Sequence, residues 1–450
     1  MSTNSFIQVP PDSTGKRLHA QQHTVDAVAV HAQVLHIGSG DNPLNLQYVD
    51  ARGQAYTRYA EGSPSIDAFG NLRVGTASII GGYEYTNGSA DDLFQDAAAT
   101  GGGLVYDAAR SEVILSAGTA NGASVTRTSN RYHYYQPGVG NLVIKTLYFG
   151  DLGRENNSRG FMYGDDNNGL FWELDGTVLY VGIRSNISGT VIDTRIAQAN
   201  WNADKLDGTG ISGMTLDLMK ANFYFLDFAW LGVGPVRFGL LGPGGERNVC
   251  HVFQNPNANG SAYMRTGSLP VRWWNKNKGA TSGTSELRTI CCAVYAESQV
   301  DYTFWRYCDI ERLTPIEVTT RTPIFSMRVK AGSRVGIYPE ALNVMVSGGD
   351  VMLEILDDAT LTSATWAIPG EGLAEGDVGA TAVSGGSRFQ SYWRSAGAHT
   401  IDLKPVYETN DEGYHRLADD SDSYTFTLVA TKLSGTTVTV AGDLNYRELR

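Results

Sequence analysis

Residues 223–230, Phe-Tyr-Phe-Leu-Asp-Phe-Ala-Trp, decide the fold of this chain. Successive side chains of a β-strand point to opposite faces, so Tyr224, Leu226 and Phe228 share one face with Trp230. The opposite face carries Phe223, Phe225, Asp227 and Ala229, and it is therefore almost as apolar. A strand that is apolar on both faces belongs inside a sandwich or barrel rather than in an exposed sheet.

Elsewhere in the chain, apolar segments that we interpret as strands alternate with turns rich in Gly, Asn and Asp. Leu174-Asp175-Gly176-Thr177 precedes Val178 and predicts a hairpin, because Asp-Gly favours a tight primed turn. Glycine is abundant, at 52 of 450 residues, and charged residues make up only 18%. We predict an all-β protein with a jelly-roll or lectin-like β-sandwich as its central domain. Further strands are expected at Val113–Ala117, Leu142–Phe149, Val178–Ile183, Val236–Leu241 and Ile290–Ala296.

Shifts in composition divide the chain into three predicted domains. Residues 1–60 form an N-terminal arm with anchoring strands, residues 61–318 the central sandwich, and residues 319–450 a smaller antiparallel β-sandwich. The last domain is expected from clean alternation, as where Phe325, Met327 and Val329 interleave with polar residues. The segment Ala90–Ala99 is rich in Ala and Asp and is the one good helix candidate of its region.

The first 24 residues are expected to be extended. Pro10-Pro11 favours extended backbone, and a strand is predicted from Val25 to Ile37. Such an arm can dock on a neighbouring subunit or pair within its own domain, and the sequence leaves both alternatives open.

Composition also limits the partners. The net charge is −12 and the pI is about 5.2, so the surface repels phosphate and no nucleic-acid partner is expected. No run of about 20 apolar residues is present, and membrane insertion is not expected. The start of the chain lacks the pattern of a signal peptide, which favours synthesis and folding in a cytoplasm.

No constellation in the sequence predicts catalysis, a cofactor or a metal. The four cysteines, Cys250, Cys291, Cys292 and Cys308, match no zinc spacing and are expected to be reduced and buried. The acidic clusters 165–168 and 419–422 lack a calcium-loop spacing and are interpreted as polar turns. Adjacent acids in a turn also fit glycoside cleavage poorly, so we expect no enzymatic activity.

The aromatic residues are the one candidate binding set. If residues 271–274 form a strand, one of Trp273 and Trp274 must face away from the core. Tyr134 and Tyr135 cluster near Pro137. Each of the four is a candidate contact for a partner subunit or a glycan, and packing in the core is the alternative.

Several longer motifs resemble a β-rich module of tailed-bacteriophage virion structural proteins. The resemblance covers roughly residues 60–320 and rests on segments 131–138, 164–176, 201–210, 227–239 and 263–272. It implies a non-enzymatic structural component of the virion, an oligomer on the tail, neck or baseplate that is assembled in the host bacterial cytoplasm. Its partners would then be copies of itself and neighbouring virion proteins. The alternative is a receptor-binding appendage, a fibre or spike that recognises host surface glycans.

Overall fold

The computed structural model describes residues 77–298, 305–333, 335–368, 372–405 and 423–449, together with the backbone of five strands in residues 1–73. Within these residues the regular structure is strand, apart from short helical turns such as η1 (Asp91–Leu93) and η2 (Gln198–Asn200). The chain divides into two compact units, residues 1–73 and 74–450. The all-β prediction is confirmed.

The first unit contains two small antiparallel sheets. One has the order β1 (Asn4–Gln8), β2 (Arg17–Val25), β3 (Val28–Gln33), and the other pairs β4 (Gln47–Val49) with β5 (Ala55–Thr57). Strands β1 and β2 lie in the segment expected to be an extended arm, and they pair within their own unit. Docking of this segment on a neighbouring subunit stays a prediction. Of the single strand predicted from Val25 to Ile37, Val25 ends β2 and residues 28–33 form β3, while residues 26, 27 and 34–37 lie outside the described residues.

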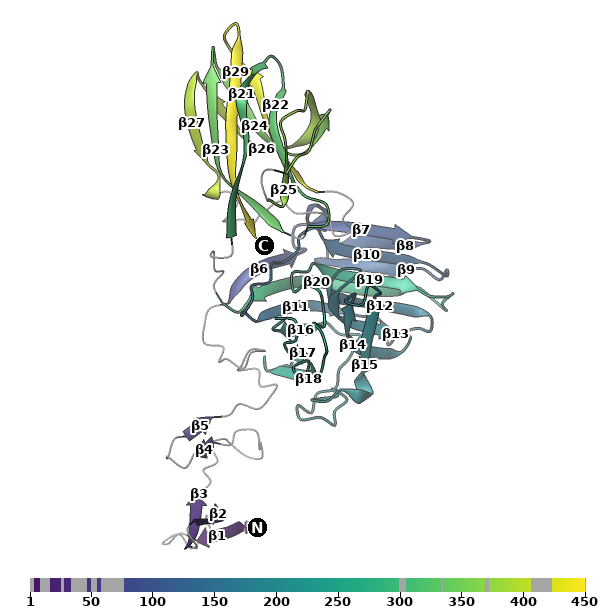
Figure 1. Ribbon diagram of the computed structural model, residues 1–450. Helices are drawn as coiled ribbons and strands as arrows, with labels where there is room; N and C mark the ends of the chain where they lie inside the picture. The colour runs from purple at the N-terminus through teal and green to yellow at the C-terminus, as the bar shows by residue number, and fades with distance from the viewer. Residues whose placement is uncertain are drawn as a thin grey trace. The chain divides into compact units, whose positions relative to one another are not determined.

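Two large antiparallel sheets form a sandwich in residues 78–296 (Figure 1). One core fills the space between them, with buried side chains from both sheets. The seven-stranded sheet has the order β15 (Ile192–Ala197), β14 (Val178–Ser185), β13 (Gly169–Asp175), β12 (Asn157–Gly164), β19 (Val271–Asn277), β10 (Ser124–Ser129), β7 (Phe94–Ala99). The eight-stranded sheet has the order β18 (Arg247–Phe253), β17 (Val236–Leu241), β16 (Asn222–Phe228), β11 (Asn141–Tyr148), β20 (Ser285–Ala296), β9 (Glu112–Ala117), β8 (Gly102–Asp107), with β6 (Ser78–Glu84) also paired to β20.

Strand β16 confirms the predicted strand for residues 223–228 and ends before Ala229. It lies between β11 and β17, and Tyr224, Leu226 and Phe228 are buried in the core. Phe225 and Asp227 on its other face are also buried. The hairpin predicted before Val178 is present between β13 and β14, and its turn consists of Gly176 and Thr177. Gly176 has φ +61°, a backbone conformation that glycine adopts without steric cost.

The helix predicted for Ala90–Ala99 is wrong. Only η1 is helical, and the residues from Phe94 onward form β7, which pairs with β10. The buried Phe94 ring packs against Tyr83 and Trp273, with ring centroids 4.9 and 5.9 Å apart. This packing and the ladder with β10 outweigh the weak helix preference of a short Ala-rich segment.

Two more antiparallel sheets enclose a separate core in the C-terminal part. Phe325, Met327 and Val329 are buried in it, as their alternation predicts. The sheets have the orders β21 (Trp305–Val318), β29 (Val438–Leu449), β23 (Gly336–Ser347), β27 (Gly397–Asp402) and β25 (Ala374–Asp377), β22 (Thr322–Val329), β28 (Thr425–Lys432), β24 (Val351–Thr362), β26 (Ala382–Arg394). Because β21 pairs with β29, the change of sheets lies between Ala296 and Trp305, ahead of residue 318. The division into three domains stays a prediction.

Candidate functional site: a cleft on the seven-stranded sheet

Strand β19 separates the two neighbouring tryptophans. Trp273 is fully buried in the sandwich core, whereas Trp274 is half-buried on the face of the sheet that points away from this core. A cleft of about 390 Å³ lies on that face, within the range of small-ligand sites. We call it the outer cleft; it is lined by Thr126, Met162, Asp166, Phe171, Glu173, Arg184, Asp193, Arg195, Arg272, Trp274, Lys276 and Lys278.

Two glycines make room for aromatic rings over the strands of the outer cleft. Gly160 on β12 is opposite Trp274, and an added Cβ there would come within 2.8 Å of the indole. Gly182 on β14 is opposite Phe171, and an added Cβ would lie 2.3 Å from the phenyl ring. The two rings meet edge to face, with centroids 6.4 Å apart. The floor of the cleft therefore has an aromatic platform.

A chain of hydrogen bonds fixes the indole ring of Trp274. Its Nε1 donates to Ser158 Oγ at 3.2 Å, and Ser158 Oγ donates to Glu173 Oε1 at 2.6 Å. Arg195 Nη1 donates to the other oxygen, Glu173 Oε2, at 2.9 Å. The Arg195 guanidinium also lies over the ring of Tyr180, 4.8 Å from its centroid. The platform is thus held in one orientation before any ligand arrives.

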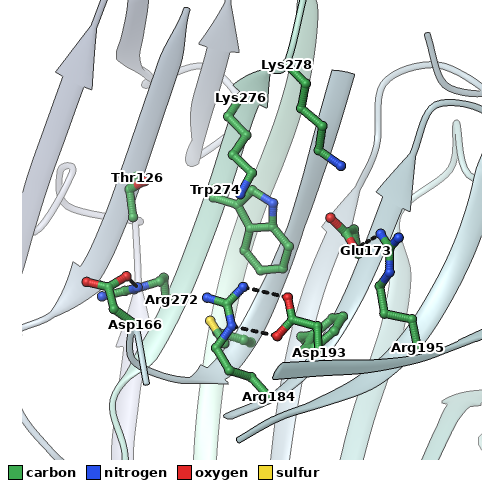
Figure 2. A pocket seen from close by; sticks show the side chains of 12 residues that line it. Thr126, Asp166, Glu173, Arg184, Asp193, Arg195, Arg272, Trp274, Lys276 and Lys278 are labelled. Carbon is green, nitrogen blue, oxygen red and sulfur yellow. Dashed lines mark hydrogen bonds and ion pairs between the residues drawn. The ribbon is translucent and has the colours of Figure 1, made fainter. Parts of the chain in front are cut away.

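Ion pairs surround the platform (Figure 2). Arg184 binds Asp193 through two bonds, Nε to Oδ1 at 2.8 Å and Nη2 to Oδ2 at 2.9 Å. Burial raises the pKa of Asp193, but the bonds and charge of Arg184 outweigh this and hold the pKa below its usual value. Arg272 donates to Asp166 through Nη1 and to Thr128 Oγ1 at 2.9 Å through Nε.

A second acidic residue of β13, Asp175, borders the outer cleft. Its Oδ2 accepts hydrogen bonds at 2.8 Å from both Arg195 Nη1 and Lys278 Nζ. Burial raises the pKa of Asp175, but these two cations outweigh it and leave the pKa lowered. Asp175 and Asp193 are therefore held as anions at neutral pH.

The other three candidate residues of the sequence do not line the outer cleft. Trp273 is covered by the core, where the Lys145 ammonium lies 3.8 Å from its ring centroid. Tyr135 is buried, stacks on Phe228 and accepts a hydrogen bond from Leu231 N at 3.2 Å. Tyr134 is half-buried, and burial raises the pKa of its hydroxyl. Of the four, the structure brings Trp274 alone to this site.

The acidic cluster 165–168 is a turn, as the sequence analysis interprets it. Asp165 Oδ1 accepts hydrogen bonds from the backbone N–H groups of Asn167 and Asn168, both at 2.8 Å, and so closes the loop between β12 and β13. Asp166 points outward to Arg272. The second cluster, residues 419–422, lies outside the described residues.

Within the described part of the chain, no group of three or more His, Cys, Asp or Glu side chains could hold a metal ion. Cys250 and Cys292 are buried, and burial raises the pKa of the Cys292 thiol to about 12. Cys291 points the other way, with its Sγ 3.4 Å from Thr146 Oγ1, so adjacent thiols diverge as predicted. Among the described residues, no helix has the length and apolar character needed to cross a membrane.

Sequence reasoning did not find the charged residues of the outer cleft. Arg184, Asp193 and Arg195 come from β14 and β15, and Lys276 and Lys278 follow Trp274 at alternate positions. The available signal was this period of two beyond Trp274, which places residues 274, 276 and 278 on one face. Which residues of β14 and β15 join them depends on pairings that the sequence does not display.

Comparisons with known proteins give likenesses of fold. No family model matches the sequence, and no curated protein matches it. Among solved structures, the chain is similar to the cellulose-induced protein Cip1, at 13% identity over 49% of this chain and 98% of that chain, with a TM-score of 0.31. It is similar to a family 16 glycosyl hydrolase protein from Mycobacterium smegmatis, at 13% identity over 48% of this chain and 100% of that chain, with a TM-score of 0.33. A legume lectin-like domain from Entamoeba histolytica is 8% identical over 49% of this chain and 98% of that chain, with a TM-score of 0.31.

Proposed function

We propose that this chain is a glycan-binding protein and that the outer cleft holds the sugar. The observation that carries the proposal is Trp274, a half-buried indole on the floor of a polar cleft. The flat apolar face of a sugar ring stacks on such an indole, while its hydroxyls take hydrogen bonds from side chains around it. The resemblance to tailed-phage virion proteins then implies a receptor-binding appendage that recognises host surface glycans.

The surroundings of Trp274 support binding at low entropic cost. The indole is held by Ser158 and Glu173, and Arg184 is held by Asp193, so the polar groups that would meet sugar hydroxyls are already placed. A site whose side chains are fixed in advance loses little conformational entropy when the ligand binds.

The same geometry favours binding over hydrolysis. Glu173 and Asp175 both accept from Arg195 Nη1, at 2.9 and 2.8 Å, so they are close enough to flank a glycosidic bond. A glycosidase needs one carboxylic acid that is still protonated near neutral pH, which requires a raised pKa. Asp175 has a lowered pKa, and both oxygens of Glu173 are already engaged, Oε1 by Ser158 and Oε2 by Arg195. We therefore place this pair in the support of the cleft and propose no enzymatic activity.

A purely structural role on the tail, neck or baseplate, through contacts with copies of itself and other virion proteins, stays a prediction. It needs no ligand in the outer cleft. Glycan binding to the purified chain separates the two functions directly.

The test is binding of the purified full chain to an array of bacterial surface polysaccharides and defined oligosaccharides. Trp274→Ala should weaken binding at least about fivefold, because it removes the stacking surface. Trp393→Ala is the matched control, since Trp393 is a 72% exposed tryptophan on β26, remote in sequence from the cleft strands. Absence of any bound glycan, or equal binding by the Trp274→Ala variant, would overturn the proposal.

A further inference from the structure

Strand β19 and the residue after it present a linear series of side chains to the outer cleft. Trp274, Lys276 and Lys278 occupy alternate positions and all three line the cleft. Alternate residues of a strand are about 7 Å apart along its axis. A ligand stacked on the indole would therefore have its next substituent within reach of Lys276.

The cations of the outer cleft differ in their partners. Four of the five are ion-paired: Arg184 with Asp193, Arg272 with Asp166, Arg195 with Glu173 and Asp175, and Lys278 with Asp175. Lys276 is exposed, and among the described residues its ammonium has no carboxylate within 4.0 Å and no hydrogen-bond acceptor. Figure 2 shows its side chain extending beside Trp274, apart from the pairs marked by dashed lines.

The charge around Lys276 is compensated incompletely. Five cationic side chains line the cleft and four carboxylates pair with them, whereas the whole chain carries a net charge of −12. Partial burial lowers the pKa of Lys276; the nearby charges of Glu173 and Asp193 raise it, and those of Arg184 and Lys278 lower it. This local excess of positive charge attracts an anion to the cleft, whereas the net negative charge of the protein repels the anion elsewhere.

We infer that the glycan of the outer cleft is anionic and that Lys276 is the residue that selects it, by binding a carboxylate or sulfate on the sugar stacked over Trp274. This inference rests on the proposed function. It narrows the ligand to acidic saccharides, such as uronates, sialylated glycans or sulfated glycans. Neutral sugars of the same backbone would stack on the indole but leave Lys276 without its counter-ion.

The test compares ligands that differ only in the acid. Isothermal titration calorimetry measures the affinity for hexagalacturonate and for the same hexasaccharide with its carboxylates reduced to alcohols. An array of sulfated and sialylated oligosaccharides then distinguishes which kind of anion is bound. The variants are Lys276→Gln, Lys276→Arg, Trp274→Ala and, as a matched control outside the cleft, the exposed Lys205→Gln. Circular dichroism and the thermal midpoint verify that each variant folds.

We expect the wild-type chain to prefer at least one acidic glycan over its neutral counterpart by about fivefold or more, and Lys276→Gln to abolish this preference. Lys276→Arg should keep most of it, and Lys205→Gln should change nothing. The preference should shrink as salt is raised from 50 to 500 mM, because the Lys276 side chain is exposed to solvent (~10 Å Debye length at 0.1 M).

Three outcomes would overturn the inference. Equal affinity for acidic and neutral sugars, with binding still lost in Trp274→Ala, rejects the acid selectivity and leaves the proposed glycan binding intact. No binding to any saccharide rejects both. Binding to heparin and to single-stranded DNA alike, unaffected by Trp274→Ala, would identify an unspecific polyanion surface instead of a sugar site.

Discussion

A lysine buried in the core of the central sandwich makes the stability of this protein depend on pH. Lys145 on β11 is 1% exposed, and its Nζ donates to the carbonyl oxygens of Met162 at 2.8 Å and Arg272 at 3.1 Å. Both acceptors lie in strands of the opposite sheet, so the side chain spans the core. Burial lowers the pKa of Lys145 from 10.5 to about 7.

The direction of the effect follows from proton binding. Between pH 7 and 10.5 the unfolded chain holds a proton on Lys145 that the folded chain has largely released, so the free energy of unfolding rises with pH. The gain is complete above about pH 10.5 and is lost as the pH falls through 7. From pH 7.0 to 8.5, a folded pKa of about 7 gives an increase of about 1.6 kcal/mol from this one group.

The substitution Lys145→Met removes this titration while keeping an unbranched side chain of similar length. Urea unfolding of the wild type and the variant at pH 7.0, 7.5, 8.0 and 8.5, followed by the fluorescence of buried core tryptophans such as Trp172 and Trp273, gives the two pH profiles. The pH range stops at 8.5 because the raised pKa of Cys292 gives an opposite dependence above about pH 9, where the unfolded thiol loses its proton first.

We expect the wild-type free energy of unfolding to rise by about 1.6 kcal/mol more than that of Lys145→Met over this range. The exposed Lys205→Met serves as the control and should follow the wild-type profile. Parallel profiles for wild type and Lys145→Met would refute the reasoning, since they would mean that Lys145 has an ordinary pKa in the folded protein.

Two further predictions test the platform and the core. Gly160→Ala should destabilise the protein by about 1–3 kcal/mol and weaken glycan binding, because the new Cβ would meet the Trp172 carbonyl oxygen at 2.1 Å and the Trp274 ring at 2.8 Å. Chemical denaturation measures the stability and titration measures the affinity. A variant with unchanged stability and affinity would contradict this geometry. The Cys292 thiol should react with a thiol reagent at pH 8 far more slowly in the native protein than in 6 M guanidinium, because burial raises its pKa to about 12. Labelling followed by peptide mass spectrometry measures the two rates. Equal rates would show that the core opens readily.

Several features were determined by the sequence alone, because they depend on neighbours along the chain. The alternation in residues 223–230 fixed a strand that is buried on both faces, and β16 has this form. The glycine at 176 fixed the place of a hairpin, since its positive φ is a local property. The adjacent Trp273 and Trp274 had to diverge for the same reason, because the period of a strand is two.

Only the tertiary structure decided the phase of that alternation and the partners of each strand. A period of two does not tell which tryptophan faces the core; the pairing of β19 with β10 and β12 does. The same long-range pairing turned an Ala-rich segment, 94–99, into β7, because the ladder and the burial of Phe94 outweigh local preference. It also brought the cleft residues of β19 beside those of β14 and β15, which lie about 80 to 95 positions earlier in the chain, and it buried the amine of Lys145 between the sheets. Contacts of that length have no local signature, and the candidate site is made of them.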